Sequence, residues 1–209
     1  MSDRLARIIS ILFHPVFVSP YLLIFFISTD SSLIFQDFHK RWILLLVFCV
    51  FTTLLPLLSI YMFYTFRIVR SVELHLREER FLPYLTSAIY YAALFQLLHG
   101  LPLPFLYSAV ALSGCFTLFV LMLINTKKKI SAHAAACGVV SGLLLFSNLF
   151  SDNPDRTVVV FVITLFIAGL VGFARLQLKA HTSGEWYGGF TSGFLSVWIS
   201  IYAYVWIFY

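Results

Sequence analysis

Long segments without a charged residue recur along this chain, and they restrict it to very few folds. Residues 157–173 and 190–209 contain no charged side chain at all. About 20 apolar residues are enough for a helix to cross a bilayer. Over the whole chain 61% of residues are hydrophobic and 11% are charged, whereas in soluble domains the shares are about half and about a quarter. The sequence therefore predicts an all-α fold, a polytopic transmembrane helical bundle with six to seven spans.

Seven apolar segments are long enough to be these spans. They are residues 8–27, 42–66, 82–98, 103–125, 130–150, 157–178 and 186–208. Two of them contain a proline that predicts a kink: Pro15, next to His14, in the first and Pro56 in the second. We interpret His14 as part of the kink or as a satisfied polar contact. The chain is expected to form a single membrane domain, with N-terminal helices in residues 1–66 and the functional core in residues 67–209.

Features that could indicate other partners have simpler explanations. The net charge of +5 accompanies no soluble basic domain, so we expect no nucleic-acid partner, and cations in the loops instead set the topology and contact membrane lipids. Cys49, Cys115 and Cys137 lie inside apolar segments without paired spacing, which indicates neither a disulfide nor a metal site. Asp152 and Asp155 could form a divalent-cation site, but they stand among turn-forming residues, which favours a plain turn.

Arg175, His181 and Glu185 stand together where one apolar segment ends and the next begins. Ionisable groups at the edge of a membrane are costly and usually face a bundle interior or a watery cavity. If the helix continues from residue 175 to 181, the arginine and the histidine lie roughly 9 Å apart along its axis. The residues after His181 then break the helix and fold the carboxylate back toward the imidazole. A histidine oriented by a carboxylate, with a cation nearby for an anion, is typical of nucleophilic catalysis.

Residues 67–80 are the most charged segment of the chain. Apolar residues recur within it and predict an interfacial helix that buries them on one side, namely Ile68, Val69, Val72, Leu74 and Leu76. Most charges of the segment are expected on a solvated face. Arg80 differs, because it adjoins the next span, where its long cationic side chain can reach inward.

Between the fourth and fifth spans, a triple lysine leads into Ser131 and His133. Lys129 and His133 are four residues apart, so on a helix they share one face. A histidine one turn inside a span is costly without a purpose. The small residues that follow let neighbouring helices approach closely, namely Ala134, Ala135, Ala136, Gly138, Ser141 and Gly142.

Counting the spans places these three polar segments on the same side of the membrane. The first follows span two, the second follows span four and the third follows span six, so an even number of crossings separates each from the next. Segments that are far apart in the sequence can therefore form one site.

The three segments resemble the signatures of the type 2 phosphatidic acid phosphatase (PAP2) superfamily, in the same order, over about residues 70–195. The third signature, Ser-Arg-x5-His-x3-Asp, is matched by Arg175, His181 and Glu185. The chain departs from it at Ala174, where serine is expected, and at Glu185, where aspartate is expected.

The two other signatures match in part. The second, Pro-Ser-Gly-His, is matched by Ser131 and His133 but lacks its proline and glycine. The first, Lys-x6-Arg-Pro, is matched by Arg80, with Glu73 at the position of the lysine and Pro83 three residues after the arginine. The resemblance therefore carries over the arginine of this signature but not its lysine.

The resemblance implies an integral-membrane lipid phosphatase with a PAP2-like helical core. Its substrate would be a lipid phosphate monoester or diphosphate, such as phosphatidic acid, phosphatidylglycerol phosphate, a polyprenyl diphosphate or a lipid A phosphate. Arg80, Lys129 and Arg175 would bind the phosphate oxygens, and Ser131 would donate a further hydrogen bond. We expect neither a metal nor another cofactor, because three cations already balance the phosphate.

The resemblance also implies roles for the histidines and the carboxylate. His181 would attack phosphorus and form a phosphohistidine. Glu185 would hold the other nitrogen of that ring and stabilise the cation that forms. His133 would protonate the leaving alkoxide and then activate water.

Other functions remain open at this stage. A non-catalytic PAP2 homologue would bind a lipid phosphate without turnover, which fits the missing lysine and the change from aspartate to glutamate. A small membrane transporter would need ionisable residues midway through its spans, and spans two to seven carry none there. We expect a multi-pass protein of the cell inner membrane. The charge distribution favours a cytoplasmic site, whereas the resemblance favours the outer face.

Overall fold

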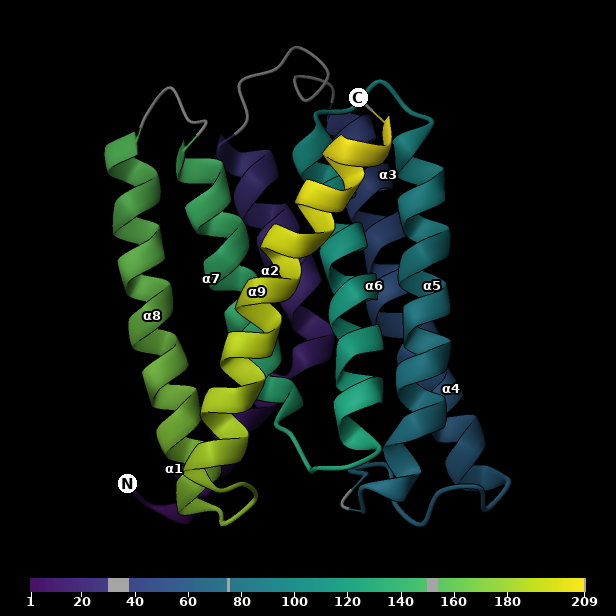
Figure 1. The fold of residues 1–209 in the computed structure, drawn as a ribbon, viewed down its shortest axis with the longest axis vertical. Helices are drawn as coiled ribbons and strands as arrows, with labels where there is room; N and C mark the ends of the chain where they lie inside the picture. Colours follow the sequence, from purple (N-terminus) through teal and green to yellow (C-terminus); the bar gives the residue numbers. More distant parts are fainter. Residues whose placement is uncertain (30–37, 75, 150–153, 209) are drawn as a thin grey trace.

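The chain folds into a bundle of helices that run roughly side by side (Figure 1). The computed structural model describes residues 1–29, 38–74, 76–149 and 154–208, and within these ranges it contains helices and loops but no strand. The α-helices are α1 (Asp3–Leu12), α2 (Pro15–Thr29), α3 (Phe38–Cys49), α4 (Leu55–Thr65), α5 (Phe81–His99), α6 (Phe105–Asn125), α7 (Ala132–Leu149), α8 (Pro154–Gln177) and α9 (Ser183–Phe208). The predicted all-α fold is confirmed.

Within the described residues, six helical segments are long and apolar enough to cross a membrane. They are Phe38–Thr65, Glu78–His99, Phe105–Asn125, Ala132–Leu149, Val158–Gln177 and Ser183–Ile207. The pair α1 and α2, bent by 57°, makes a seventh if it counts as one broken span. Large apolar side chains such as Leu46, Phe166 and Trp206 are 64%, 68% and 79% exposed, which suits a lipid environment. The helices thus indicate a multi-pass membrane protein.

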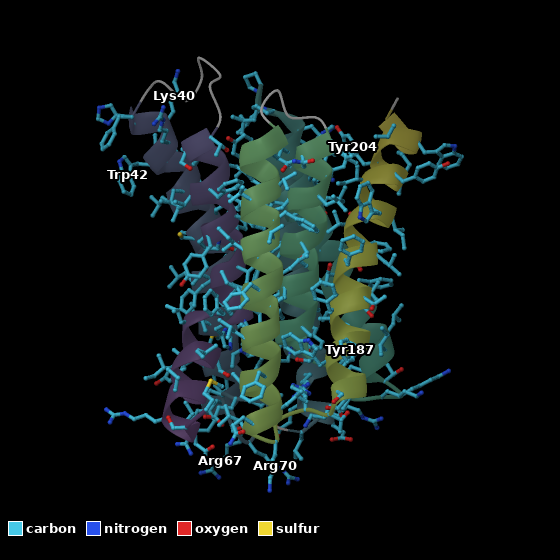
Figure 2. The ribbon with its side chains drawn as sticks, turned by 90° about the vertical axis from the view of Figure 1, so that its left-hand side faces the viewer. Lys40, Trp42, Arg67, Arg70, Tyr187 and Tyr204 are labelled. Atoms are coloured by element: carbon cyan, nitrogen blue, oxygen red, sulfur yellow. The ribbon has the colours of Figure 1, made fainter. Side chains whose placement is uncertain are left out.

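Charged and aromatic side chains mark the two ends of the bundle. Lys40, Trp42 and Tyr204 lie toward one end, and Arg67 and Tyr187 lie toward the other (Figure 2). Tryptophan and tyrosine are enriched where membranes meet water, because one side of the ring is apolar and the other carries a polar group. This distribution is consistent with helices that cross a bilayer lengthwise.

The kink predicted at His14 and Pro15 is a full break between two helices. Helix α1 ends at Leu12 and α2 begins at Pro15, since proline lacks the amide hydrogen that a continuing helix needs. The main-chain N–H of Val16 donates to Nδ1 of His14 at 3.4 Å. Helix α1 then packs against α8, so the N-terminal segment closes one side of the bundle near the end of α8.

The second predicted kink, at Pro56, is accommodated by a π-helical turn, η2 (Val50–Leu54), between α3 and α4. A proline ring inside a helix collides with the carbonyl group four residues earlier, here that of Thr52. A π-turn inserts an extra residue into the helix and moves that carbonyl away. Because of this turn, α3 and α4 continue as one span from Phe38 to Thr65.

Glycines allow α7 and α9 to approach each other closely, as the small residues after His133 predicted. A Cβ atom added to Gly138 would overlap the main chain of Phe190, and one added to Gly193 would overlap the main chain of Ala135. Gly189 of α9 likewise lies against the carbonyl oxygen of Ser131. Close contact of backbones is how helices associate in a membrane, where the hydrophobic effect contributes little.

The prediction of an interfacial helix in residues 67–80 is wrong. The described part of this segment consists of turns and bends, followed by a single 3-10 turn, η3 (Glu78–Arg80). Arg67 and Leu74 have φ angles of 59° and 53°, which a right-handed helix excludes. Of the five apolar residues expected to be buried, Val69 is 2% exposed while Ile68 is 52% exposed. Hydrogen bonds of its polar groups to the neighbouring loop determine the path of this segment more than amphipathicity does.

Candidate active site

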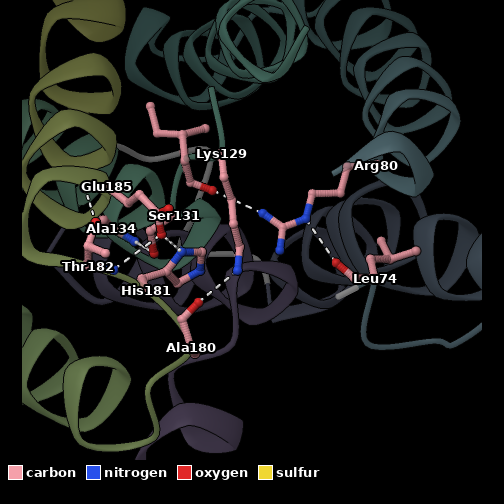
Figure 3. A network of polar contacts seen from close by, with 10 residues as sticks. Leu74, Arg80, Lys129, Ser131, Ala134, Ala180, His181, Thr182 and Glu185 are labelled. Atoms are coloured by element: carbon pink, nitrogen blue, oxygen red, sulfur yellow. Dashed lines mark hydrogen bonds and ion pairs between the residues drawn. The ribbon is translucent and has the colours of Figure 1, made fainter. Parts of the chain in front are cut away.

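The three polar segments meet at one end of the bundle, as the span count predicted (Figure 1). Nη1 of Arg80 donates to the carbonyl oxygen of Ile130 at 3.0 Å, and Nζ of Lys129 donates to that of Ala180 at 3.0 Å. The main-chain N–H of Ser131 donates to the carbonyl oxygen of Glu185 at 3.2 Å. Each bond joins segments about fifty residues apart, so the site is held together mainly through the backbone of its loops (Figure 3).

Helix α8 ends at Gln177, so the helix does not continue to His181 as one expectation assumed. Lys179 has a φ of 50°, the left-handed conformation that commonly terminates a helix. The N–H of Ala180 donates to the carbonyl oxygen of Arg175 at 3.1 Å, and the N–H of Lys179 donates to that of Leu176 at 2.9 Å. This pair of bonds is a Schellman motif. It turns the chain sharply and brings His181 back under the end of the bundle.

Helix α9 begins with a capping box that positions the carboxylate. The hydroxyl of Thr182 accepts the N–H of Glu185 at 3.3 Å, and Oε2 of Glu185 accepts the N–H of Thr182 at 3.2 Å. A Ser or Thr followed three residues later by Glu or Gln forms this reciprocal pair at helix starts. The glutamate that replaces the expected aspartate therefore has a structural reason to be there.

The same carboxylate oxygen holds the imidazole of His181. Nδ1 of His181 lies 2.9 Å from Oε2 of Glu185. A carboxylate only accepts, so Nδ1 carries the proton and Nε2 of His181 keeps a free lone pair. The predicted orientation of the histidine by the carboxylate is thus present in the structure, although the turn that produces it is different.

The surroundings of His181 keep its ring neutral. Burial lowers the pKa of His181 most, and the nearby charges of Arg175, Arg80 and Lys129 lower it further, while the hydrogen bond to Glu185 opposes them. The net effect is a pKa of about 4. A neutral imidazole with one oriented lone pair is the form that can act as a nucleophile.

A cavity of about 530 Å³ connects most of the predicted site residues. It lies between the ends of the helices and the loop of residues 66–79. The acidic side chain and the basic side chains that line it are Glu73, His14, Arg80, His133, Arg175 and His181. Its size is within the range of pockets that bind small molecules. The structure therefore brings Arg80, Arg175 and both candidate histidines to one cavity.

The two arginines of this cavity are placed differently. Arg80, which is 8% exposed, is held at the start of α5 by two carbonyl groups: Nε donates to Leu74 at 2.9 Å and Nη1 to Ile130. Nε of Arg175 is buried, and among the described residues it has no hydrogen-bond partner. A buried donor on a cation is costly when it lacks an acceptor. Arg175 also lines the cavity, so its positive charge is available to an anion there.

His133 lies one turn inside the bundle near the start of α7. Nε2 of its ring lies 3.1 Å from the carbonyl oxygen of Ser10, so Nε2 is the protonated nitrogen and Nδ1 is left to exchange protons. The rings of His133 and His14 meet edge to face, with centroids 5.3 Å apart. Helix α1 thus contributes directly to the position of the second candidate histidine.

Lys129 and Ser131 bond to other groups of the protein. Nζ of Lys129 is bonded to Ala180, and Lys129 is absent from the residues that line the cavity. Oγ of Ser131 accepts the N–H of Ala134 at 3.3 Å, which makes this serine the N-cap of α7. Both residues hold the loops that carry the site, and their predicted contact with phosphate stays a prediction.

No family model, curated protein or solved structure that we compared with this chain matches it. The site must therefore be interpreted from its own geometry. The possible cation site at Asp152 and Asp155 cannot be described, because Asp152 and the side chain of Asp155 lie outside the described residues. Among the residues that the structure does describe, no group of three or more His, Cys, Asp or Glu side chains could hold a metal ion.

Sequence reasoning missed three residues of the site. The role of Thr182 could have been predicted from sequence, because Thr-x-x-Glu is the pattern of a capping box. His14 was interpreted as part of a kink, and it is, but the break directs it toward the cavity. Glu73 was noticed only as a missing lysine. Its place in the cavity follows from the turns and bends of its segment, whereas the recurring apolar residues there predicted a helix.

Proposed function

We propose that this protein is an integral-membrane lipid phosphatase, which hydrolyses a lipid phosphate monoester or diphosphate through a phosphohistidine on His181. The observation that carries the proposal is the bond of 2.9 Å between Nδ1 of His181 and Oε2 of Glu185, in a cavity also lined by Arg80 and Arg175. This combination offers an oriented nucleophile next to two cations, as transfer of a phosphoryl group requires. The partial match to the PAP2 signatures is consistent with it.

The two arginines bind the phosphate. Guanidinium groups form paired hydrogen bonds with phosphate oxygens, and Arg80 and Arg175 both line the cavity. During in-line transfer the negative charge spreads over the equatorial oxygens, and fixed cations stabilise it. Lys129 adds positive charge close by, from its place on the carbonyl of Ala180.

His181 carries the covalent step. Its Nε2 attacks phosphorus, so that an N–P bond forms while the ester P–O bond breaks. The ring then bears a positive charge, which Glu185 stabilises through the proton on Nδ1. In the second step a water oxygen attacks phosphorus, the N–P bond breaks, and inorganic phosphate leaves with His181 neutral again.

His133 moves the protons. A bound phosphate dianion favours the imidazolium form of His133, which protonates the leaving alkoxide in the first step. The neutral ring then takes a proton from the attacking water in the second step, so the ring is regenerated. The bond from Nε2 to Ser10 leaves Nδ1 for both transfers.

An amphiphilic substrate suits the location of the cavity. The site lies at the end of helices whose outer surfaces are apolar, close to the depth at which lipid headgroups would lie. A lipid phosphate can present its phosphate there while its chains remain in the bilayer. We propose the cell inner membrane as the location, because phosphorylated lipids are made and recycled there.

Phosphate release by the purified protein in detergent tests the proposal. The substrates are phosphatidic acid, phosphatidylglycerol phosphate and polyprenyl diphosphate. We expect turnover of at least one of them, abolished in His181→Ala, unchanged by a chelator and inhibited by vanadate, which adopts the geometry of the transferring phosphoryl group. Binding without release of phosphate would favour the non-catalytic homologue. Loss of activity with chelator, restored by magnesium, would contradict this mechanism.

A further inference from the structure

Helix α1 packs one of its sides against the bundle and exposes another. Ala6 and Ser10 are buried, and α1 packs against α8. Leu5, Ile8 and Leu12 are 48%, 53% and 53% exposed. Their spacing of three and four residues places these three on one side of the helix. Helix α1 therefore carries an exposed apolar stripe along its length.

The exposed charges of α1 are positive. Arg4 and Arg7 are exposed and stand three residues apart, so they share a side of the helix, next to the apolar stripe. The single carboxylate of α1 belongs to Asp3, and it accepts a hydrogen bond from Nε2 of Gln177, at the end of α8, at 3.2 Å. A helix with an apolar stripe and arginines on its polar side is typical of the membrane interface.

The position of α1 suits the surface of a membrane. It lies at the end of the bundle where the three polar segments meet (Figure 1). Its axis is bent by 57° from that of α2, and the hydroxyl of Tyr21 donates to the carbonyl oxygen of Leu12 at 3.1 Å across this bend. Arginine is costly among lipid chains, so Arg4 and Arg7 belong at the level of the headgroups. Anionic headgroups complement their charge.

Helix α1 also holds one group of the candidate site. Nε2 of His133 lies 3.1 Å from the carbonyl oxygen of Ser10, a buried residue of α1. This bond leaves Nδ1 for proton transfer, so the direction in which Nδ1 points depends on where α1 lies. Residues 3–12 do not line the cavity. A lipid that α1 binds through its exposed side is therefore separate from a substrate in the cavity.

We infer that α1 binds anionic phospholipid headgroups at the membrane surface through Arg4 and Arg7, and that this contact keeps the carbonyl oxygen of Ser10 against His133. The contact with lipid follows from α1 itself, whereas its effect on turnover rests on the proposed function. The bound phospholipid acts as a regulator: it stabilises the orientation of the group that moves protons, and it is not consumed.

Exchange of backbone amide hydrogens in α1 tests the contact and needs no turnover. The purified protein is placed in nanodiscs of phosphatidylcholine alone, or of equal amounts of phosphatidylcholine and phosphatidylglycerol. Each arginine near an anionic surface strengthens binding roughly 5-fold, so with phosphatidylglycerol the exchange should slow by roughly 5- to 25-fold. Arg4→Gln combined with Arg7→Gln should remove this difference. Equal exchange of wild-type α1 in both bilayers would overturn the inference.

The single-turnover rate of phosphoenzyme formation in the same nanodiscs tests the link to His133. Phosphatidic acid has a poor leaving group that needs a proton, whereas p-nitrophenyl phosphate has a good one. We expect phosphatidylglycerol to raise the rate for phosphatidic acid by roughly 3- to 10-fold, part of the contribution of a positioned proton donor, and the rate for the nitrophenyl ester little. The rise should vanish in the arginine variant and in His133→Ala. No rise, or an equal rise for both substrates, would overturn the link.

Lys127→Gln combined with Lys128→Gln is the matched control. Both lysines are exposed at the same end of the bundle, and the change in charge is the same. This variant should keep the lipid dependence of α1 exchange and of the rate, and its loss here would assign the effect to surface charge in general and overturn the inference. Lipid-dependent exchange without release of phosphate from any substrate would support the contact and overturn the phosphatase. Turnover with lipid-independent exchange would overturn the inference and leave the phosphatase in place.

Discussion

Nζ of Lys129 lies 3.0 Å from the carbonyl oxygen of Ala180, the residue that immediately precedes His181. A lysine expected from sequence to bind phosphate is thus hydrogen-bonded to the turn that carries the proposed nucleophile. This hydrogen bond joins the second polar segment to the third (Figure 3). It gives Lys129 a positioning role, which can be separated from a direct contact with phosphate.

The first prediction concerns this positioning role. Lys129→Met frees the turn before His181, and displacing a reacting atom by about 1 Å can lower kcat on the order of 100-fold. We expect kcat to fall by roughly 10- to 100-fold while competitive inhibition by inorganic phosphate changes little. Lys128→Met, at an exposed neighbour, is the control and should behave as wild type. A large loss of phosphate affinity with unchanged kcat would instead assign Lys129 to direct binding.

The second prediction separates the two histidines. His181→Ala should abolish both turnover and covalent labelling by a phosphate-labelled substrate. His133→Ala should slow turnover by roughly 10²- to 10⁴-fold, the usual contribution of a positioned proton donor. A substrate with a better leaving group should then restore the first step in part, so that an acid-labile, base-stable adduct accumulates on His181. Label on another residue, or activity in His181→Ala, would show that the assignment is wrong.

The third prediction is the pH dependence of phosphoenzyme formation. The nucleophile is neutral His181, and its pKa is lowered to about 4. A lowered pKa means that the neutral form persists as the pH falls, so the single-turnover rate should hold to about pH 5 and decline only near pH 4. Glu185→Gln still offers Nδ1 a neutral acceptor, but it removes the carboxylate charge that strengthens the hydrogen bond raising this pKa, so it should move the decline to lower pH. A midpoint near 6.5 in the wild-type protein would contradict the prediction.

The fourth prediction concerns Glu73, a carboxylate in the phosphate cavity. Its charge interacts with that of Arg175, so it offsets part of the positive charge that a phosphate would meet. Glu73→Gln should therefore lower the KM for a phosphate monoester, by roughly 3- to 10-fold at low salt, and less at high salt because of screening. Glu78→Gln, outside the cavity and 3.5 Å from Arg77, is the control. A loss of kcat in Glu73→Gln would indicate that the carboxylate takes part in the reaction.

The fifth prediction is the membrane side of the site. Eleven of the fourteen Lys and Arg residues belong to segments on the side of the site, and the exceptions are Lys40, Arg41 and Arg156. Without the proposed phosphate ligands Arg80, Lys129 and Arg175, eight Lys and Arg residues remain on the side of the site, against three on the other side. The positive-inside rule therefore predicts a cytoplasmic site. Helix α9 ends at the opposite face (Figure 1). A reporter fused to the C-terminus should then be active outside the cytoplasm, and the reverse result would put the site on the outer face.

Several elements could be predicted from sequence because their cause is local. The apolar segments determine the helices, and the even number of crossings between polar segments determines that they share one end. The proximity of His181 and Glu185 follows from four residues of spacing around a helix start. Each of these inferences needs only composition, periodicity or turn chemistry from a short stretch of chain.

The remainder depends on contacts between distant segments. The loop that carries Glu73 is shaped by bonds such as Asn125 to the carbonyl oxygen of Arg77 at 2.8 Å, which no local pattern encodes. The charges in residues 67–80 looked like the polar face of a helix, but two left-handed residues interrupt it. Likewise, His14 reaches the cavity because α1 packs against α8, a contact between segments far apart in the sequence that no local pattern predicts.

The glycine contacts between α7 and α9 have a consequence for the chemistry. His133 stands at the beginning of α7 and Glu185 at the beginning of α9, so the glycine contacts between these helices fix the distance between two residues of the proposed site. A methyl group added at Gly138 or Gly193 would meet backbone and not a yielding side chain. It would push α7 and α9 apart. The distance between the proposed acid and the proposed nucleophile thus depends on residues that do not line the cavity.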